Sequence, residues 1–586
     1  MQFRGDLYIM MNSKHTVIVF SLLLAACANV SQPDMRQAGQ PESNSKDQSE
    51  DQADDRVDLP RLELTGQLLY EFMLGDVALQ RGRPDLAAQT YLELARATRD
   101  PRVARYAAHL AAETRQMKQA LAAAGLWLEL EPDSLRAKRM LVTLLLGGGM
   151  LDEARSHLAG MLAADPGNTF LQIYPMLARH PDKAAAFDLA LELTQPYPRV
   201  AEARWVLAQG AEAAGKHEVA VAEARQARSL RPEWDKAVLL EAQLLRAEAP
   251  QQTLAVLQKY LASYPDNMDV RLYYARVLME RKQYQSARTE FQRLLDANPD
   301  NADLTFAVAL LSLEMGELDR AERELRQALD YGKKDESAVY YYLGQLHEAK
   351  KHDAEALQNY RKVGEGEYAF PARTRTAFLL NKVGKLEEAR QTLHQIKAQD
   401  DQQRVQLLLI EAQLLRDNKQ PEAAYQVLTQ VMEKIPNHPE LLYEAAMLAD
   451  QIGKHETFEQ LLRQLIQIKP DHAHAYNALG YSMLERNERV PEGMQLVEKA
   501  YRMEPDDAAI IDSMGWGYYR LGNLAKSVEF LRRAYTANPD PEIAAHLGEV
   551  LWMQGNRREA TKIWQQARKA HADNAVLEAV VKKFLP

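Results

Sequence analysis

The sequence predicts an all-α protein built as an array of helical hairpins. Alanine and leucine are abundant, β-branched runs are scarce, and glycine and proline number 27 and 25 among 586 residues. This composition favours helices. Prolines also recur every 32 to 35 residues in two long runs, and a fixed period of this length is typical of a solenoid. The prolines that mark the period are Pro132, Pro166, Pro198, Pro232, Pro265, Pro299, Pro436, Pro470, Pro505 and Pro539.

One unit of this period, from Asp506 to Pro539, shows why it predicts a hairpin. Apolar residues recur at spacings of three and four on both sides of Leu521-Gly522-Asn523. This is the pattern of two amphipathic helices joined by a tight turn. Pro539 ends the second helix because proline has no N–H to donate. Two such helices cannot enclose a core alone, so each hairpin must stack on its neighbours.

Small residues recur at the eighth, twentieth and twenty-seventh positions of the units, and proline follows near the thirty-second. Helix backbones approach closely where the side chain is only a hydrogen or a methyl group. This pattern resembles the tetratricopeptide repeat (TPR), and the resemblance implies stacked hairpins in a right-handed superhelix. The residues that carry it are Gly480, Gly515, Gly548, Ala208, Ala275 and Ala412 at position eight, Ala287, Ala321, Ala424 and Ala560 at position twenty, and Ala227, Ala328, Ala534 and Ala567 at position twenty-seven.

About fifteen repeats fit between roughly Thr65 and Asn574. Pro175 falls where the first helix of its repeat requires a small residue, and Pro181, Pro196 and Pro198 crowd the same stretch. We therefore expect a broken or shifted helix and an irregular joint over residues 169–198, with a second join at Gly364–Glu367. The predicted division is a signal peptide in 1–26, a lipidated cysteine and tether in 27–60, an N-terminal TPR-like array in 61–198, the main TPR array in 199–575 and a capping helix in 576–586.

The single cysteine, Cys27, excludes an intramolecular disulfide. A short basic region at Lys14 and an apolar run up to Leu24 precede it, and the run is too short to span a bilayer comfortably. This is the architecture of a signal peptide. Leu24-Ala25-Ala26-Cys27 resembles the bacterial lipobox, which implies cleavage before Cys27, acylation of its thiol and, because Ala28 follows, retention in the outer membrane with the body in the periplasm. A buried structural cysteine is the alternative.

Residues 28–60 are rich in Gln, Ser, Asp and Pro and have almost no large apolar side chains. Such a segment cannot bury enough surface to offset its ordering entropy, so we expect a solvated tether with a reach of about 30 Å. Upstream, Met1, Met10 and Met11 all offer starting methionines, and the sequence leaves that choice open.

Composition and motifs both favour a protein without catalytic activity, cofactor or metal. The net charge of −10 argues against nucleic-acid binding. No phosphate-binding or dinucleotide glycine motif occurs, and Gly147–Gly149 is expected to be a loop. His347 and His352 are five residues apart, whereas a zinc-protease motif needs four, and His472 and His474 lack a third ligand nearby in the sequence.

What remains is a protein-binding surface. In the TPR family, positions two, five, nine and twelve of each first helix line a concave groove. The residues at these positions in the last three repeats are His474, Asn477, Tyr481, Asp512, Trp516, Tyr519, Glu549 and Trp552. Large amphipathic aromatics are typical of interface hot spots, although Trp516 and Trp552 could instead fill space between helices. Tyr341 with Tyr273 and Tyr274 forms a second candidate patch.

Three stretches add a closer resemblance: ALGYS at 478–482, IDSMGW at 511–516 and DPEIAAHLGEVLW at 540–552. With the lipobox and tether, they resemble the large TPR outer-membrane lipoproteins of Gram-negative bacteria, and among these the LbcA-like adaptors, lipoprotein binding partners of a carboxyl-terminal processing protease. The resemblance implies an adaptor that brings such a protease to cell-wall hydrolase substrates. A structural component of an envelope assembly or polysaccharide export complex is the alternative. A lipid-anchored enzyme has no residue constellation behind it.

Overall fold

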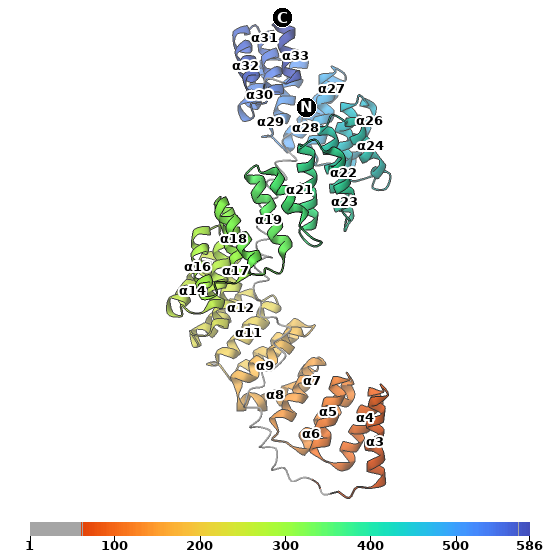
Figure 1. Cartoon of the computed structure of the whole chain (residues 1–586), viewed down its shortest axis with the longest axis vertical. Helices are drawn as coiled ribbons and strands as arrows, with labels where there is room; N and C mark the ends of the chain where they lie inside the picture. Colours follow the sequence, from red (N-terminus) through yellow and green to blue (C-terminus); the bar gives the residue numbers. More distant parts are fainter. Residues whose placement is uncertain (1–59, 61, 572–573, 586) are drawn as a thin grey trace. The chain divides into compact units, whose positions relative to one another are not determined.

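The computed structural model describes residue 60, residues 62–571 and residues 574–585. The regular structure of these residues is α-helical, and no strand occurs among them (Figure 1). The chain divides into two compact units, one ending at Lys333 and the other beginning at Lys334. The predicted signal peptide, Cys27 and the tether lie outside the described residues. None of the helices in the described residues is long and apolar enough to cross a membrane.

The unit that ends at Lys333 contains sixteen described helices. They are α3 (Gly66–Gln80), α4 (Pro84–Thr98), α5 (Pro101–Glu113), α6 (Met117–Leu130), α7 (Leu135–Gly147), α8 (Leu151–Ala164), α9 (Pro166–Arg179), α10 (Lys183–Thr194), α11 (Ala201–Ala213), α12 (His217–Leu230), α13 (Asp235–Leu245), α14 (Pro250–Ser263), α15 (Met268–Glu280), α16 (Tyr284–Ala297), α17 (Ala302–Glu314) and α18 (Leu318–Asp330).

The second unit contains fifteen described helices. They are α19 (Glu336–Ala349), α20 (Asp353–Arg361), α21 (Ala369–Lys382), α22 (Leu386–His394), α23 (Asp401–Asp417), α24 (Pro421–Met432), α25 (Pro439–Gln451), α26 (His455–Ile468), α27 (Ala473–Glu485), α28 (Val490–Met503), α29 (Ala508–Arg520), α30 (Leu524–Ala537), α31 (Pro541–Met553), α32 (Arg557–Ala570) and α33 (Ala575–Phe584).

Consecutive helices pack in pairs, from α3 with α4 to α31 with α32. Within the described residues this gives fifteen hairpins, which confirms the predicted all-α repeat array. The last helix, α33, packs against α31 and α32 and buries Leu577 and Val581. The sequence limits predicted for the two arrays and the cap stay a prediction.

The turn inside the hairpin of α29 and α30 is the tight turn that the sequence predicts. Gly522 has φ +80°, a left-handed conformation in which an L side chain is strained. Its N–H donates to the carbonyl of Tyr519, and the N–H of Asn523 donates to that of Tyr518. Asn523 then caps α30 by accepting a hydrogen bond from Lys526 N at 3.1 Å. The chain reverses within three residues, which sets α29 directly against α30.

The small residue at position eight allows this close packing. A Cβ on Gly515 would lie 2.6 Å from Leu531 Cγ, and one on Gly480 would lie 2.6 Å from the carbonyl oxygen of Gly493. Both distances are shorter than van der Waals contact, so a side chain there would push the two helices of the hairpin apart. The structure thus confirms the physical reason given for the repeat pattern.

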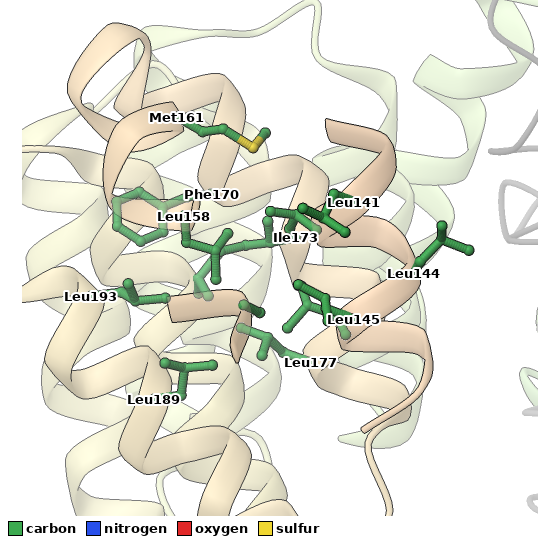
Figure 2. Packing of buried hydrophobic residues seen from close by; sticks show 14 of the residues in the cluster. Leu141, Leu144, Leu145, Leu158, Met161, Phe170, Ile173, Leu177, Leu189 and Leu193 are labelled. Atoms are coloured by element: carbon green, nitrogen blue, oxygen red, sulfur yellow. The ribbon is translucent and has the colours of Figure 1, made fainter. Parts of the chain in front are cut away.

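The expected break at Pro175 is wrong, because α9 continues through it from Pro166 to Arg179. Figure 2 shows why: Phe170, Ile173 and Leu177 of α9 point into one apolar cluster with side chains of α7 and α8. This burial on both sides of the proline outweighs its helix-breaking tendency. The hairpin is irregular all the same, since α9 packs more extensively against α11 than against α10. The second expected join, Gly364–Glu367, lies in the connection between α20 and α21.

Candidate functional site

The eight residues predicted to line a groove come from α27, α29 and α31, which pack side by side with α33 at the end of the row. These are the first helices of their hairpins, with α33 as the next helix in order. We call the side of the array that these four helices form the first-helix surface. The structure therefore brings the predicted residues onto one side of one unit.

The centre of this surface is a buried ion pair between α29 and α31. Both carboxylate oxygens of Asp512 lie within 3.0 Å of His546 Nδ1, and the two side chains are 3 and 7% exposed. Burial lowers the pKa of His546, but the Asp512 carboxylate outweighs that effect and the net pKa is raised. Tyr481 of α27 adds its hydroxyl at 3.3 Å from His546 Nε2. Three consecutive first helices thus share one polar cluster.

Trp516 belongs to the interior of this cluster. It is 3% exposed, and its ring stacks on the His546 ring with 4.2 Å between centroids. The Arg520 guanidinium lies over two of the rings, 4.8 Å from the centre of the Trp516 ring and 5.9 Å from the centre of the Tyr519 ring. For Trp516, the structure therefore shows the packing role that the sequence left open, while a contact with a partner stays a prediction.

The buried polar atoms of this surface that have no hydrogen-bond partner in the protein include the side-chain oxygen of Asn477 in α27 and the indole nitrogen of Trp516 in α29. Asn477 is 2% exposed, so its oxygen has also lost most of its water. Buried polar groups in proteins are usually paired, which makes these two atoms candidates for contact with a ligand.

The end of the surface is formed by Tyr519, Glu549 and Trp552 with the helix α33. The Tyr519 hydroxyl donates to Glu549 Oε1 at 3.4 Å, and Lys583 Nζ lies 3.1 Å from the same oxygen. Burial, followed by the Glu549 charge, raises the pKa of Tyr519. Trp552 packs against Phe584 with 5.8 Å between ring centroids. Tyr519 and Trp552 remain half-buried, so each keeps an accessible edge.

His474 lies in a setting that the sequence did not predict. His474, Glu504 and Asp507 each offer a ligand atom, and these atoms lie within 4.8 Å of one another. The expectation that His474 has no further ligand nearby is therefore wrong, because the connection before α29 brings Glu504 and Asp507 close to it. The Asp507 carboxylate also accepts the N–H of Ile510 at 2.8 Å and thereby caps α29.

Of the eight predicted residues, four are buried and four are half-buried. The buried ones are Asn477, Asp512, Trp516 and Glu549, and the half-buried ones are His474, Tyr481, Tyr519 and Trp552. His546 was missed. Its only sequence signal is a place in the stretch 540–552, since its link to Asp512, 34 residues earlier, depends on how α29 and α31 pack.

The second candidate patch is not a surface at Tyr341. That residue is 1% exposed and packs against Tyr360 and Tyr368, with ring centroids 5.9 and 5.2 Å away. Burial raises its pKa to about 12. Tyr273 and Tyr274 are half-buried and pack against the apolar core of α13 to α15.

A small hollow of about 270 Å³ lies beside α22 and α23. Its polar floor is Glu411, which accepts hydrogen bonds from Arg390 Nε at 2.9 Å and pairs with His394 Nε2 at 2.9 Å. The other walls include Leu393 and Ile396. Because both oxygens of Glu411 already have partners, the hollow offers little polar recognition.

These features define a helical-repeat protein. Its polar and aromatic surface runs along α27, α29 and α31, the first helices of the last three hairpins. Sequence models of the tetratricopeptide repeat match residues 244–311, 281–346, 415–480 and 513–541. The TPR repeat-containing protein PA4667 of Pseudomonas aeruginosa is 37% identical over 484 residues, which are 82% of this chain and 82% of that protein. The chain belongs to the tetratricopeptide repeat family, whose fold is typically a non-catalytic scaffold for protein–protein interaction.

Parts of the chain are also similar to solved structures of TPR proteins. The C-terminal part of a TPR repeat-containing protein from Cytophaga hutchinsonii is 18% identical with a TM-score of 0.34, covering 41% of this chain and 98% of its own. A thermophilic TPR protein of Thermus thermophilus is 21% identical with a TM-score of 0.29, covering 31% of this chain and 99% of its own. These likenesses concern the fold alone.

Proposed function

We propose that this chain is a non-enzymatic periplasmic scaffold, anchored to the outer membrane through lipid on Cys27, which holds segments of partner proteins on the first-helix surface. Its partners would be a carboxyl-terminal processing protease and cell-wall hydrolases that the protease degrades. The lipobox-like Leu24–Cys27 and the three stretches at 478–482, 511–516 and 540–552 support this adaptor role.

The observation that carries the binding part of the proposal is the pair of unpartnered polar atoms. The amide oxygen of Asn477 is able to accept a hydrogen bond, and the indole N–H of Trp516 is able to donate one, but neither does so within the protein. An extended peptide segment offers both complements, a backbone N–H and a backbone carbonyl, once the side chains that cover these two atoms move aside. A buried polar group without a partner costs about 1–3 kcal/mol, so a segment that supplies both partners gains that free energy on binding.

The half-buried aromatics beside these atoms give the surface its remaining recognition chemistry. Tyr481, Tyr519 and Trp552 offer the accessible parts of their rings, and aromatic rings contribute large apolar contact area at low entropic cost. Arg520 adds a positive charge, since its nearest carboxylate, Glu485, is 4.0 Å away. A partner segment with an apolar or aromatic side chain and a nearby carboxylate matches this arrangement.

Two buried asparagines provide a matched test. Asn477→Ala removes an unpartnered buried oxygen and no hydrogen bond within the protein, so thermal stability should not fall while partner binding weakens by about tenfold. Asn359→Ala removes the bond from Asn359 Nδ2 to the carbonyl of Glu355, 2.8 Å long, so it should lower stability without affecting binding. Calorimetry and pull-down of both variants give the two readouts. Normal partner binding by Asn477→Ala would reject the assigned surface.

Partner identity is tested separately, by pull-down of the lipid-anchored chain from detergent-solubilised envelopes. A processing protease together with cell-wall hydrolases is the expected recovery. Recovery of channel or polysaccharide-export subunits alone would reject the adaptor role and favour an export complex. The anchor is tested by Cys27→Ser, which should release the chain from the membrane fraction. A variant that stays in that fraction would contradict the lipid anchor.

A further inference from the structure

The first described helix, α3, has apolar residues on every side, and its polar side chains are Gln67, Glu71, Asp76 and Gln80. Its sequence GQLLYEFMLGDVALQ contains no Lys or Arg and only two acidic residues. One side packs on the rest of the repeat: the Tyr91 ring of α4 covers Gly75, where a Cβ would lie 2.7 Å from the ring, and the Tyr91 hydroxyl donates to Asp76 Oδ1 at 2.5 Å. These contacts fix which side of α3 faces outward.

The outward side carries an apolar stripe. Leu69, Met73 and Val77 lie on successive turns, and Tyr70 and Phe72 flank them. All five are between 42 and 65% exposed. We call these five residues the α3 stripe. A helix that is apolar all round is normally buried, so the stripe calls for a covering surface.

The other end of the array is built differently. There α33 buries Leu577 and Val581 and turns the lysines Lys582 and Lys583 outward. A polar outer face of this kind is what terminal repeats need for solubility. The α3 stripe has no such polar face.

The size and chemistry of the stripe favour a second copy of this chain. With Leu62 and Leu64, which are also exposed just before the helix, it presents about 600 Å² of apolar surface, close to the roughly 800 Å² that each partner of a standard interface contributes. An anionic membrane surface is a poorer match, because interfacial helices are rich in Lys and Arg and α3 has neither.

We propose that α3 pairs in antiparallel orientation with α3 of a second copy, so that the chain forms a two-fold dimer through the α3 stripe. Met73 is the middle residue of the three successive turns and lies at the two-fold axis, where it meets its own counterpart. A two-fold interface of this kind uses the same patch on both subunits and closes on itself, which avoids open-ended assembly. The proposal does not depend on the partners of the first-helix surface.

The first test measures molecular mass by light scattering for the full chain carrying Cys27→Ser, without detergent. The expected result is a dimer. Met73→Glu would place a carboxylate at the apolar centre, so the dimer dissociation constant should rise by roughly 100-fold. Val383→Glu is the control, because Val383 is 52% exposed, as Met73 is 56%, but lies in the other unit. It should leave the dimer unchanged.

The second test uses the absence of other cysteines. Met73→Cys in the Cys27→Ser background should form a disulfide-linked dimer under mild oxidation, whereas Val383→Cys should not. A monomeric mass at all concentrations, a Met73→Glu variant that stays dimeric, or equal cross-linking from both positions would overturn the proposal. So would a monomer that binds phosphatidylethanolamine–phosphatidylglycerol vesicles and loses that binding with Met73→Glu, since the stripe would then face a membrane.

Discussion

The hairpins α29–α30 and α9–α10 occupy equivalent places in the repeat, yet they are held together differently. In the first, Gly515 and the left-handed turn at Gly522 let the two helices pack directly against each other. In the second, the first helix contains Pro175 and α9 packs mainly on α11. His180, the residue that follows α9, has ψ 133°. Where proline displaces the close hairpin contact, the next repeat supplies the packing. The repeat tolerates a weak hairpin because its neighbours are shared.

The largest expected effect comes from breaking the Asp512–His546 ion pair, through which α29 contacts α31 of the following repeat. His546→Leu would leave the Asp512 carboxylate, only 3% exposed, without its charged partner, and should lower the free energy of unfolding by about 3–5 kcal/mol. His455→Leu is the control. It removes a comparable but exposed pair, with His455 Nδ1 3.1 Å from Asp450, and should cost less than about 1 kcal/mol. Urea denaturation measures both, and equal losses would contradict the role of burial.

A smaller loss is expected inside the regular hairpin. Gly515→Val would place side-chain atoms against Leu531 and should cost about 1–3 kcal/mol through overpacking. Gly125→Val serves as the control, since a Cβ on Gly125 meets nothing within 4 Å. Hydrogen exchange should show α29 and α30 opening more often in the first variant alone. Unchanged protection of these helices would show that close approach is not what holds the hairpin together.

In the irregular hairpin the effect should have the opposite sign. Pro175→Ala restores an N–H that can donate to the carbonyl of Leu171, four residues earlier, and should stabilise the chain by about 1 kcal/mol. Thermal denaturation checks the sign. A loss of stability would mean that the proline shapes the packing of α9 on α11 rather than merely being tolerated.

The smallest expected effect is a dependence on pH through His546. Its pKa is raised above the ordinary value of 6.5, so the stability it contributes is fully present below 6.5 and is lost as pH rises through the folded-state pKa. Glu485 and Glu542 act in the same direction as Asp512. The melting temperature of the native chain should fall relative to that of His546→Gln as pH rises above 6.5. If the melting temperatures of the native chain and of His546→Gln change in parallel with pH, the Asp512–His546 pair does not cause the pH dependence.

The comparison also separates what the sequence predicts from what it cannot. Period and small residues predict the hairpins, because the turn at Gly522 and the approach at Gly515 depend on local geometry. The predicted break at Pro175 is wrong because the helix-breaking cost of a proline is local. The burial of Phe170 and Ile173 that outweighs this cost depends on neighbouring repeats.

The candidate site follows the same division. Repeat positions place the eight residues on the right helices, but they do not say which ones are buried. The sequence leaves open whether Trp516 binds a partner or packs between helices. Its stacking on His546 arises only where α29 packs against α31. The apolar character of α3 is visible in its sequence, whereas the exposure of Leu69, Met73 and Val77 appears only in the structure.

The central claim is that partner proteins bind the first-helix surface, and one hairpin suffices to test it. A photo-reactive benzoylphenylalanine at Tyr519, half-buried on α29, should cross-link to another protein in living cells. The same residue at Glu529, exposed on α30 of the same hairpin, should give no adduct. Adducts from 519 alone are the result this account predicts. Adducts from 529 alone, or equal adducts from both, would contradict it.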